Sequence, residues 1–124
     1  MVTRYCRSCE AKTECREKLH DTVCNVCDST HVFKYSLVRE HDNSTHYANV
    51  VKWVEWDRET GRAANIQSNP EVEYSCLFGP YSFLGHSSYE WLTTEIVEIV
   101  EKTDSELKFK TKNSTYTLYN HDEL

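Results

Sequence analysis

Four cysteines near the N-terminus have a spacing that suits a metal ion. They form two Cys-x-x-Cys pairs, Cys6 with Cys9 and Cys24 with Cys27, and 14 residues separate the pairs. Two thiolates spaced in this way on a tight turn can face one ion, and two such turns supply a tetrahedral shell of four sulfur atoms. The spacing therefore predicts one structural zinc ion per chain, with no open position for water or substrate.

The spacing leaves other uses of the cysteines open. The four thiols could stay reduced without a metal ion, form disulfides or act in redox chemistry, although no helix start or βαβ pattern of the thioredoxin type accompanies either pair. Three further side chains could replace one of the four ligands: Cys15, His20 and His31. We expect Cys15 to be a bystander. Cys76 lies in an apolar segment and is expected in the core.

The two pairs resemble those of zinc ribbons of the rubredoxin-like type, over about the first 35 residues. In that family each pair sits at the knuckle of a hairpin, and a glycine in the left-handed conformation usually follows the second cysteine. The corresponding residues here are Glu10 and Asp28. The resemblance implies a left-handed backbone at both positions, which Asp tolerates better than Glu.

The sequence shows none of the common enzyme motifs. Its three glycines lie too far apart for a phosphate-binding loop, neither His-Glu-x-x-His nor Gly-x-Ser-x-Gly occurs, and the six histidines show no metal spacing. We therefore expect a protein without enzymatic activity. An unrecognised enzyme stays an alternative, because catalytic groups that are distant in sequence can assemble in space.

Charge is distributed unevenly along the chain. Residues 1–34 carry six Lys and Arg against five Asp and Glu, whereas residues 35–124 carry eight against fifteen, a net charge of −7. An acidic surface repels phosphate backbones and attracts basic surfaces. We therefore expect a macromolecular partner that is a protein, with this chain acting as an adaptor or inhibitor.

A nucleic-acid partner, in transcription or nucleic-acid processing, is the alternative. Its candidate contacts are basic or aromatic residues of the N-terminal part: Arg4, Tyr5, Arg7, Lys12, Arg16 and Lys18. Five acidic residues lie among them, and four thiolates around one zinc ion would add about two negative charges. This near-neutral balance favours the protein partner.

Aromatic residues offer candidate contacts for such a partner, because Trp and Tyr are enriched in binding hot spots. The candidates are Trp53, Trp56, Tyr81 and Phe83, the last two in a loop over residues 79–86 that contains glycine and proline. A small β core also needs large side chains, so packing competes with recognition for the same residues.

Short segments of alternating or β-branched apolar residues predict a mainly β fold. The expected strands cover residues 31–38, 47–56, 63–67, 72–78, 107–112 and 115–119. Residues 91–101 fit a helix by the spacing of their apolar residues and a strand by their β-branched content, and we expect a strand. These strands indicate a small antiparallel barrel or curled sheet of the SH3-like kind.

The expected elements divide the chain into a zinc ribbon over residues 1–38, a connecting loop over 39–46 and a small antiparallel β domain over 47–124. The final hairpin resembles that of small uncharacterised β-barrel proteins of bacteria and their phages. The resemblance covers about 25 residues, including Phe109 to Leu118, and implies a bacterial or phage source for this accessory protein but no activity.

Targeting signals are expected to be absent. The chain has no apolar run of about 18 residues and no leader-like start, so we expect a cytoplasmic protein that binds no membrane. The residues from His121 to Leu124 match an endoplasmic-reticulum retrieval signal, and Asn43 and Asn113 match the glycosylation pattern. We interpret both matches as coincidences, since neither acts without entry into the secretory pathway.

Overall fold

The computed structural model describes residues 2–19, 21–83 and 86–121, with the backbone alone for residues 81–83 and 86–87. Every regular element within these ranges is a β-strand, and all strand pairings there are antiparallel. The predicted mainly β fold is confirmed. No helix in the described part of the chain is long and apolar enough to cross a membrane.

The N-terminal residues form a small four-stranded sheet in the order β3-β2-β1-β4. Its strands are β1 (Val2–Cys6), β2 (Ala11–Glu17), β3 (Thr22–Cys24) and β4 (Val32–Phe33). The core of this sheet is too small for an ordinary apolar centre: it consists of three buried cysteines and Val32. A sheet of this size needs a further source of stability, such as a bound metal ion.

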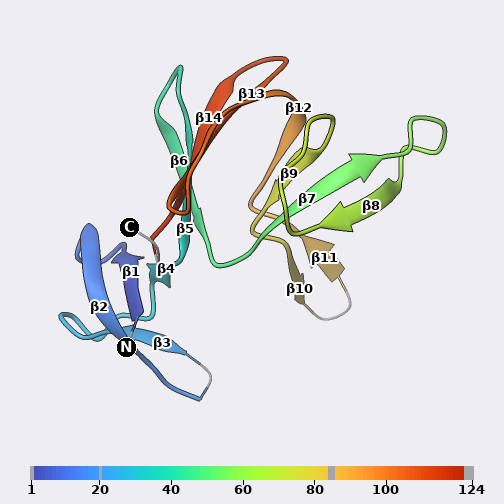
Figure 1. The fold of residues 1–124 in the computed structure, drawn as a ribbon. Helices are drawn as coiled ribbons and strands as arrows, with labels where there is room; N and C mark the ends of the chain where they lie inside the picture. The colour runs from blue at the N-terminus through green and yellow to red at the C-terminus, as the bar shows by residue number, and fades with distance from the viewer. Residues whose placement is uncertain (1, 20, 84–85, 122–124) are drawn as a thin grey trace.

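The rest of the chain forms a larger sheet in the order β6-β5-β14-β13-β12-β9-β7-β8, and a separate two-stranded hairpin. The larger sheet contains β5 (Tyr35–Arg39), β6 (Ser44–Ala48), β7 (Val51–Trp56), β8 (Ala63–Gln67), β9 (Ser75–Phe78), β12 (Trp91–Lys102), β13 (Glu106–Thr111) and β14 (Thr115–Asn120). The hairpin pairs β10 (Tyr81–Phe83) with β11 (His86–Ser88). Figure 1 shows the larger sheet curling into a half-barrel, with the small sheet beside its β5 and β6 side.

The predicted strand over residues 91–101 is confirmed as β12, the longest strand of the molecule. β-branched residues in this segment lose less side-chain freedom in a strand than in a helix. The strand pairs with β9 through its first half and with β13 through its second half. Its register shifts near Val97 and Val100, where bulges add twist and help the sheet to curl.

The concave face of the half-barrel holds the main core. Trp53 packs edge-on against Phe109 at 5.5 Å between ring centroids, and Phe109 stacks on Tyr116 at 5.4 Å. The buried core also contains Leu37, Ala48, Tyr74, Cys76, Phe78, Ile96, Leu107 and Leu118. Aromatic pairs in these geometries add about 0.5–1.5 kcal/mol each beyond their buried area.

At Gly79 the backbone after β9 approaches residues at the end of β6 and before β12 closely. Gly79 has a φ of 66°, and a Cβ at this residue would lie 2.9 Å from the Cβ of Glu90 and 3.1 Å from that of Ala48. The Gly79 amide donates a hydrogen bond of 2.9 Å to the Val50 carbonyl. His46 Nδ1 lies 2.9 Å from a carboxylate oxygen of Glu90. These contacts bring the end of β6 against the end of β9.

The two sheets meet through a small aromatic cluster. The rings of Tyr5 on β1 and Tyr47 on β6 are stacked, with centroids 4.8 Å apart, and the Phe33 ring lies 5.8 Å from that of Tyr47. The guanidinium carbon of Arg7 lies 5.2 Å from the Tyr47 ring centroid. The backbone amide of His121, which follows β14, donates to the Lys34 carbonyl at 2.7 Å.

The boundary between the two sheets differs from the predicted connecting loop. The expected strand over residues 31–38 is interrupted at Lys34, so that β4 belongs to the small sheet and β5 to the larger one. Residues 39–46 form the hairpin between β5 and β6, where Arg39 and Asp42 are ion-paired at 2.6 Å and Asn43 has a φ of 55°. The polar residues of this segment therefore make a tight turn within one sheet. The division of the chain into separate domains stays a prediction.

Two other predicted strand boundaries were wrong. The expected strand over residues 47–56 is two strands, β6 and β7, interrupted at residues 49–50. The expected strand over 72–78 begins only at Ser75, because Glu73 adopts a φ of 76° and the Tyr74 amide turns back to the Glu71 carbonyl. By contrast, the expected β13 and β14 are confirmed within one residue, and they form an antiparallel meander with β12.

Candidate metal centre

The four paired cysteines meet at one point beside the small sheet. Their Sγ atoms all lie within 4.8 Å of one another, with Cys6 to Cys27 at 3.6 Å and Cys9 to Cys24 at 3.8 Å. A tetrahedral zinc site with Zn–S bonds of about 2.3 Å places its sulfur atoms about 3.8 Å apart. The observed separations fit such a shell, so the four cysteines could hold a metal ion.

Backbone amides point at the sulfur atoms of both knuckles. The Cys9 amide donates to Cys6 Sγ, and the Val26 amide donates to Cys24 Sγ, each at 3.4 Å. Hydrogen bonds to the charged form of an acid stabilise that form. The turns therefore favour thiolates, which are the form that a metal ion binds.

Both residues that follow a knuckle have a left-handed backbone, as the resemblance to zinc ribbons implies. The φ of Glu10 is 54° and that of Asp28 is 59°. The Asp28 carboxylate is held by Arg16 at 2.6 Å, and Arg16 also donates to the Asn25 side chain at 2.8 Å. Its hydrogen bond and charge hold the pKa of Asp28 below its usual range. The second knuckle is thus braced by side chains.

Cys9 and Cys24 differ in acidity. A hydrogen bond from the Thr13 hydroxyl, 3.1 Å from Cys24 Sγ, is the main cause that lowers the pKa of Cys24 to about 6. The hydrogen bond between Cys9 and Cys27, with burial, raises the pKa of Cys9 to about 12. Such an uneven sharing of protons is expected when several thiols crowd together. A bound cation would compensate the charge of all four thiolates and release the remaining protons.

The remaining thiols and imidazoles lie outside this group. Cys15 is fully buried and lies directly across the β2–β3 pair from Cys24, but it does not belong to the four-sulfur cluster. Cys76 lies in the main core, where burial raises the pKa of its thiol. His31 does not belong to the four-sulfur cluster either, and His20 lies outside the residues that the structure describes. The sequence alone did not indicate that Thr13 hydrogen-bonds Cys24, because threonine is not part of the cysteine pattern that predicts the metal site.

The residues predicted to contact nucleic acid are largely engaged within the fold. Arg4 donates to the Thr22 hydroxyl at 3.3 Å, Arg7 lies over the Tyr47 ring, and Tyr5 stacks on the same ring. Arg16, a further candidate, contacts the side chains of Asn25 and Asp28 at the second knuckle. The three arginines of this part of the chain are therefore engaged in contacts within the fold.

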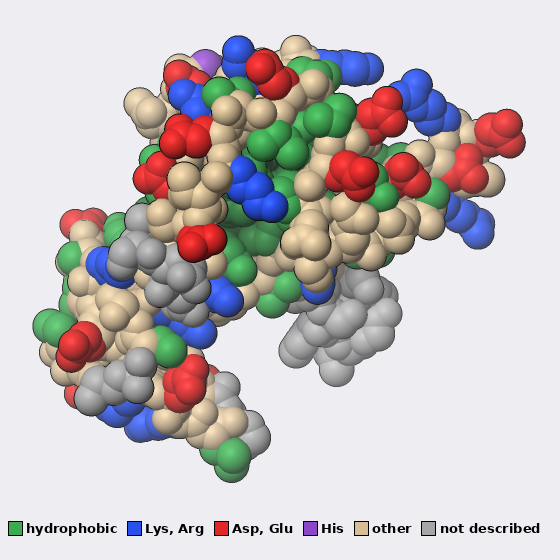
Figure 2. All heavy atoms as spheres, in the orientation of Figure 1, with side chains coloured by type: hydrophobic (Ala, Val, Ile, Leu, Met, Phe, Trp, Pro, Cys, Tyr) green, Lys and Arg blue, Asp and Glu red, His purple; other side chains and the backbone are tan. Residues whose placement is uncertain are grey.

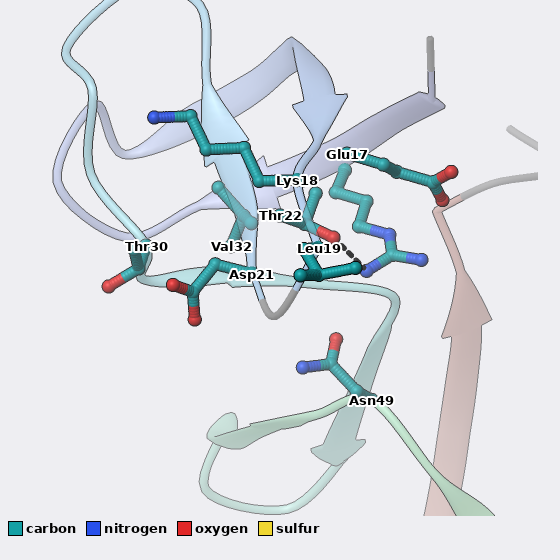
Figure 3. Close-up of a pocket in the computed structure, with 9 residues that line it drawn as sticks. Glu17, Lys18, Leu19, Asp21, Thr22, Thr30, Val32 and Asn49 are labelled. Atoms are coloured by element: carbon teal, nitrogen blue, oxygen red, sulfur yellow. Dashed lines mark hydrogen bonds between the residues drawn. The ribbon is translucent and has the colours of Figure 1, made fainter.

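A polar hollow of about 420 Å³ lies beside the small sheet (Figure 3). Lys18, Glu17 and Asp21 line it together with Asn49, and Leu19 beside them is 92% exposed. Lys12, the last candidate contact, lies on β2 and is exposed. Side chains of both charges line the hollow, so its lining selects no single charge of ligand.

The predicted protein-contacting aromatics lie in different environments. Trp53 is only 2% exposed and packs in the main core, so its assignment as a surface contact was wrong. Trp56 is half-buried, and its indole N–H donates to the Ser75 hydroxyl at 3.1 Å. Tyr81 and Phe83 lie on β10, and their side chains are outside the described part of the structure. Core packing, rather than recognition, therefore accounts for the most buried tryptophan.

The concave face leaves an apolar hollow at one end of the half-barrel. Its volume is about 140 Å³, and its apolar lining comes from Tyr35, Val51, Trp53, Leu107 and Leu118. Figure 2 shows apolar side chains within the hollow of the larger sheet and charged side chains around it. The space is too small for a drug-sized ligand, which needs about 300 Å³ or more.

No protein-family model, curated protein or solved structure matches this chain. The assignment of the metal centre therefore depends on the geometry and chemistry of the four cysteines.

Proposed function

We propose that the four cysteines bind one structural zinc ion. Four thiolates at tetrahedral separations suit zinc, and a shell completed by four protein ligands offers no position for a substrate. The buried cluster of the small sheet, three cysteines and Val32, offers little apolar area to stabilise the sheet without a metal ion. These properties support a structural role.

Metal analysis of the purified protein tests this proposal. Elemental analysis is expected to give one zinc per chain, and a colorimetric thiol titration should find that four thiols become reactive when a chelator is added. One iron per chain in place of zinc would keep the metal site but change the identity of its metal, because four thiolates also bind iron. A folded, metal-free protein with four freely reactive thiols would overturn the metal site itself.

We further propose that the protein is a non-enzymatic accessory protein that binds another protein. One observation carries the choice of partner: Arg4, Arg7 and Arg16 are engaged in contacts within the fold, as shown by their hydrogen bonds and ring contact. Nucleic-acid affinity comes mainly from Lys and Arg that are free to neutralise phosphates. The net charge of −7 over residues 35–124 adds a field that favours a basic protein surface.

Affinity purification of the tagged, full-length protein from its native cell tests the choice of partner. A protein partner should be recovered equally with and without nuclease treatment, and it should be lost progressively as salt is raised. Recovery that depends on intact nucleic acid would favour the nucleic-acid alternative. Turnover of a substrate by the purified protein would contradict the non-enzymatic assignment.

A further inference from the structure

One buried thiol of the small sheet lies beside the four-sulfur cluster without belonging to it. Cys15 is fully buried on β2, and its partner in the β2–β3 pairing is Cys24, a candidate metal ligand on β3. Residues directly opposite each other in an antiparallel pair have side chains on the same face of the sheet. The two side chains therefore point to one side, into the buried cluster that they share with Cys6 and Val32.

The backbone hydrogen bonds show which kind of pair Cys15 and Cys24 form. The amide of Asn25, one residue after Cys24, donates to the carbonyl of Glu14, one residue before Cys15, at 3.0 Å. The Cys24 amide itself donates to the Ser29 carbonyl at 2.9 Å, away from β2. Cys15 and Cys24 are therefore a non-hydrogen-bonded pair, a geometry that places the two Cα atoms about 4.5 Å apart.

A disulfide can join such a pair with little movement of the backbone. Cysteines in disulfides have Cα atoms about 4.4–6.8 Å apart, and a non-hydrogen-bonded pair falls within this range. Both sulfur atoms also contact the Thr13 hydroxyl, which lies 3.1 Å from Cys24 Sγ and 3.7 Å from Cys15 Sγ. The register and this shared contact hold the two thiols next to each other.

We propose that Cys15 and Cys24 are a redox pair, which a hydroperoxide converts into a cross-strand disulfide that takes Cys24 out of the metal shell. This inference rests on the proposed zinc site, because Cys24 is one of its four ligands. The two sulfur atoms give up two electrons and form one S–S bond. With hydrogen peroxide as the oxidant, the O–O bond breaks and two water molecules leave. Cys15 supplies one of the protons they need, and the solvent supplies the other.

An exposed neighbour gives the oxidant access to this buried pair. Cys27 is exposed, and its sulfur lies within 4.8 Å of Cys24 Sγ. A thiolate that is oxidised to a sulfenic acid condenses with a neighbouring thiol, and thiol–disulfide exchange then passes the bond to other sulfur atoms. Because strained disulfides are the more easily reduced, exchange favours the pair whose backbone already has the required separation. The net reaction is the same by this route.

The disulfide opens the metal site and keeps β2 joined to β3. Three thiolates remain around the ion, so its shell has a position open to water or a chelator. The new bond crosses the β2–β3 pair and closes the loop between the two cysteines, which restrains this part of the chain after the metal ion leaves. Oxidation therefore exchanges one cross-link of the small sheet for another.

Treatment of the full-length, zinc-loaded protein with hydrogen peroxide tests the proposal. Peptide mapping without reduction should find Cys15 linked to Cys24. One zinc per chain should pass to a chromogenic chelator, and dithiothreitol should restore zinc binding. Cys15→Ala should release zinc at least about tenfold more slowly, because it lacks the thiol that is positioned to react. Cys76→Ala is the matched control: Cys76 is also a buried thiol but lies in the main core, so the variant should release zinc as the wild type does.

The mapping uses the unsubstituted protein, so no folding defect of a variant affects it. Bound zinc before oxidation, followed by disulfides among the four ligands alone, would overturn the redox pair and leave the zinc site intact. Equal rates of zinc release from the wild type and Cys15→Ala would also overturn the pair. A folded protein that binds no metal before oxidation would overturn the zinc site and, with it, the proposed release.

Discussion

The ring of Tyr5 lies nearly parallel to the ring of Tyr47, with an angle of 7° between their planes and 4.8 Å between their centroids. Tyr5 belongs to the small sheet and Tyr47 to the larger one. The same Tyr47 ring also contacts Phe33 and Arg7. One side chain of β6 therefore connects the candidate metal centre's sheet with the half-barrel.

The first prediction concerns this connection. Tyr47→Ala removes two ring contacts and a cation–π contact at a half-buried position, and we expect the free energy of unfolding to fall by about 2–3 kcal/mol. Urea denaturation followed by fluorescence measures the change. Tyr89→Ala is the control, since Tyr89 is 50% exposed and its loss should change stability by about 0.5 kcal/mol or less. Equal effects of the two substitutions would show that the ring cluster does not couple the sheets.

The second prediction separates the ligands from the neighbouring thiol. Cys24→Ser should lower the zinc content and unfold the small sheet, because metal binding supplies its folding free energy. Cys15→Ala should leave one metal ion per chain, although a buried side chain is shortened. Elemental analysis of both variants, together with the amide NMR spectrum of residues 2–33, gives the outcome. If Cys15→Ala loses the metal and Cys24→Ser keeps it, the ligand set is wrong.

The third prediction uses the strained backbone after the first knuckle. Glu10 has a φ of 54°, where a side chain costs roughly 1 kcal/mol that glycine does not incur. Glu10→Gly should therefore raise the resistance of the small sheet to chelation, by about fivefold in the chelator concentration at half release. Glu14→Gly is the matched control, because Glu14 is also exposed but lies within β2. It should lower the resistance, since glycine weakens a strand.

The fourth prediction concerns pH and a group far from the cysteines. Hydrogen bonds from Arg39, at 2.6 and 3.1 Å, and from the Ser44 amide hold the pKa of Asp42 well below its usual range. A depressed pKa in the folded state contributes stability above the unfolded value, about 3.9, and the contribution is lost as pH falls through the folded value. NMR titration of the Asp42 carboxyl measures it. Arg39→Gln should raise the midpoint, and an unchanged midpoint would contradict the assigned cause.

Local patterns in the sequence predicted the parts of the structure that depend on neighbouring residues. The cysteine spacing predicted the four-sulfur cluster, because each knuckle is a turn that four consecutive residues define. The resemblance predicted the left-handed backbone of Glu10 and Asp28 for the same reason. Alternating residues predicted β13 and β14, which are joined by a short turn.

The parts that depend on distant contacts could not be predicted in this way. Trp53 is covered by Phe109, a residue 56 positions along the chain, so its burial does not follow from its own segment. Lys34 interrupts an apolar pattern that continues on both sides, and only the pairing of β4 with β1 and β5 with β14 separates the two strands. The requirement for glycine at Gly79 arises from the approach of Glu90 and Ala48.

The fifth prediction concerns the partner. At about 0.15 M salt, the zinc-loaded protein should not shift DNA or RNA in a gel titration at micromolar concentration, because the arginines of its small sheet are used within the fold. Its protein complex should weaken as salt rises, and Tyr81→Ala or Phe83→Ala should cost about 1–3 kcal/mol of binding free energy if these residues are anchors. Tight binding to nucleic acid that is lost on Arg4→Gln and insensitive to Tyr81→Ala would reverse the choice of partner. In that case the salt dependence of the binding constant should also fall by about one unit for each phosphate contact that a substitution removes.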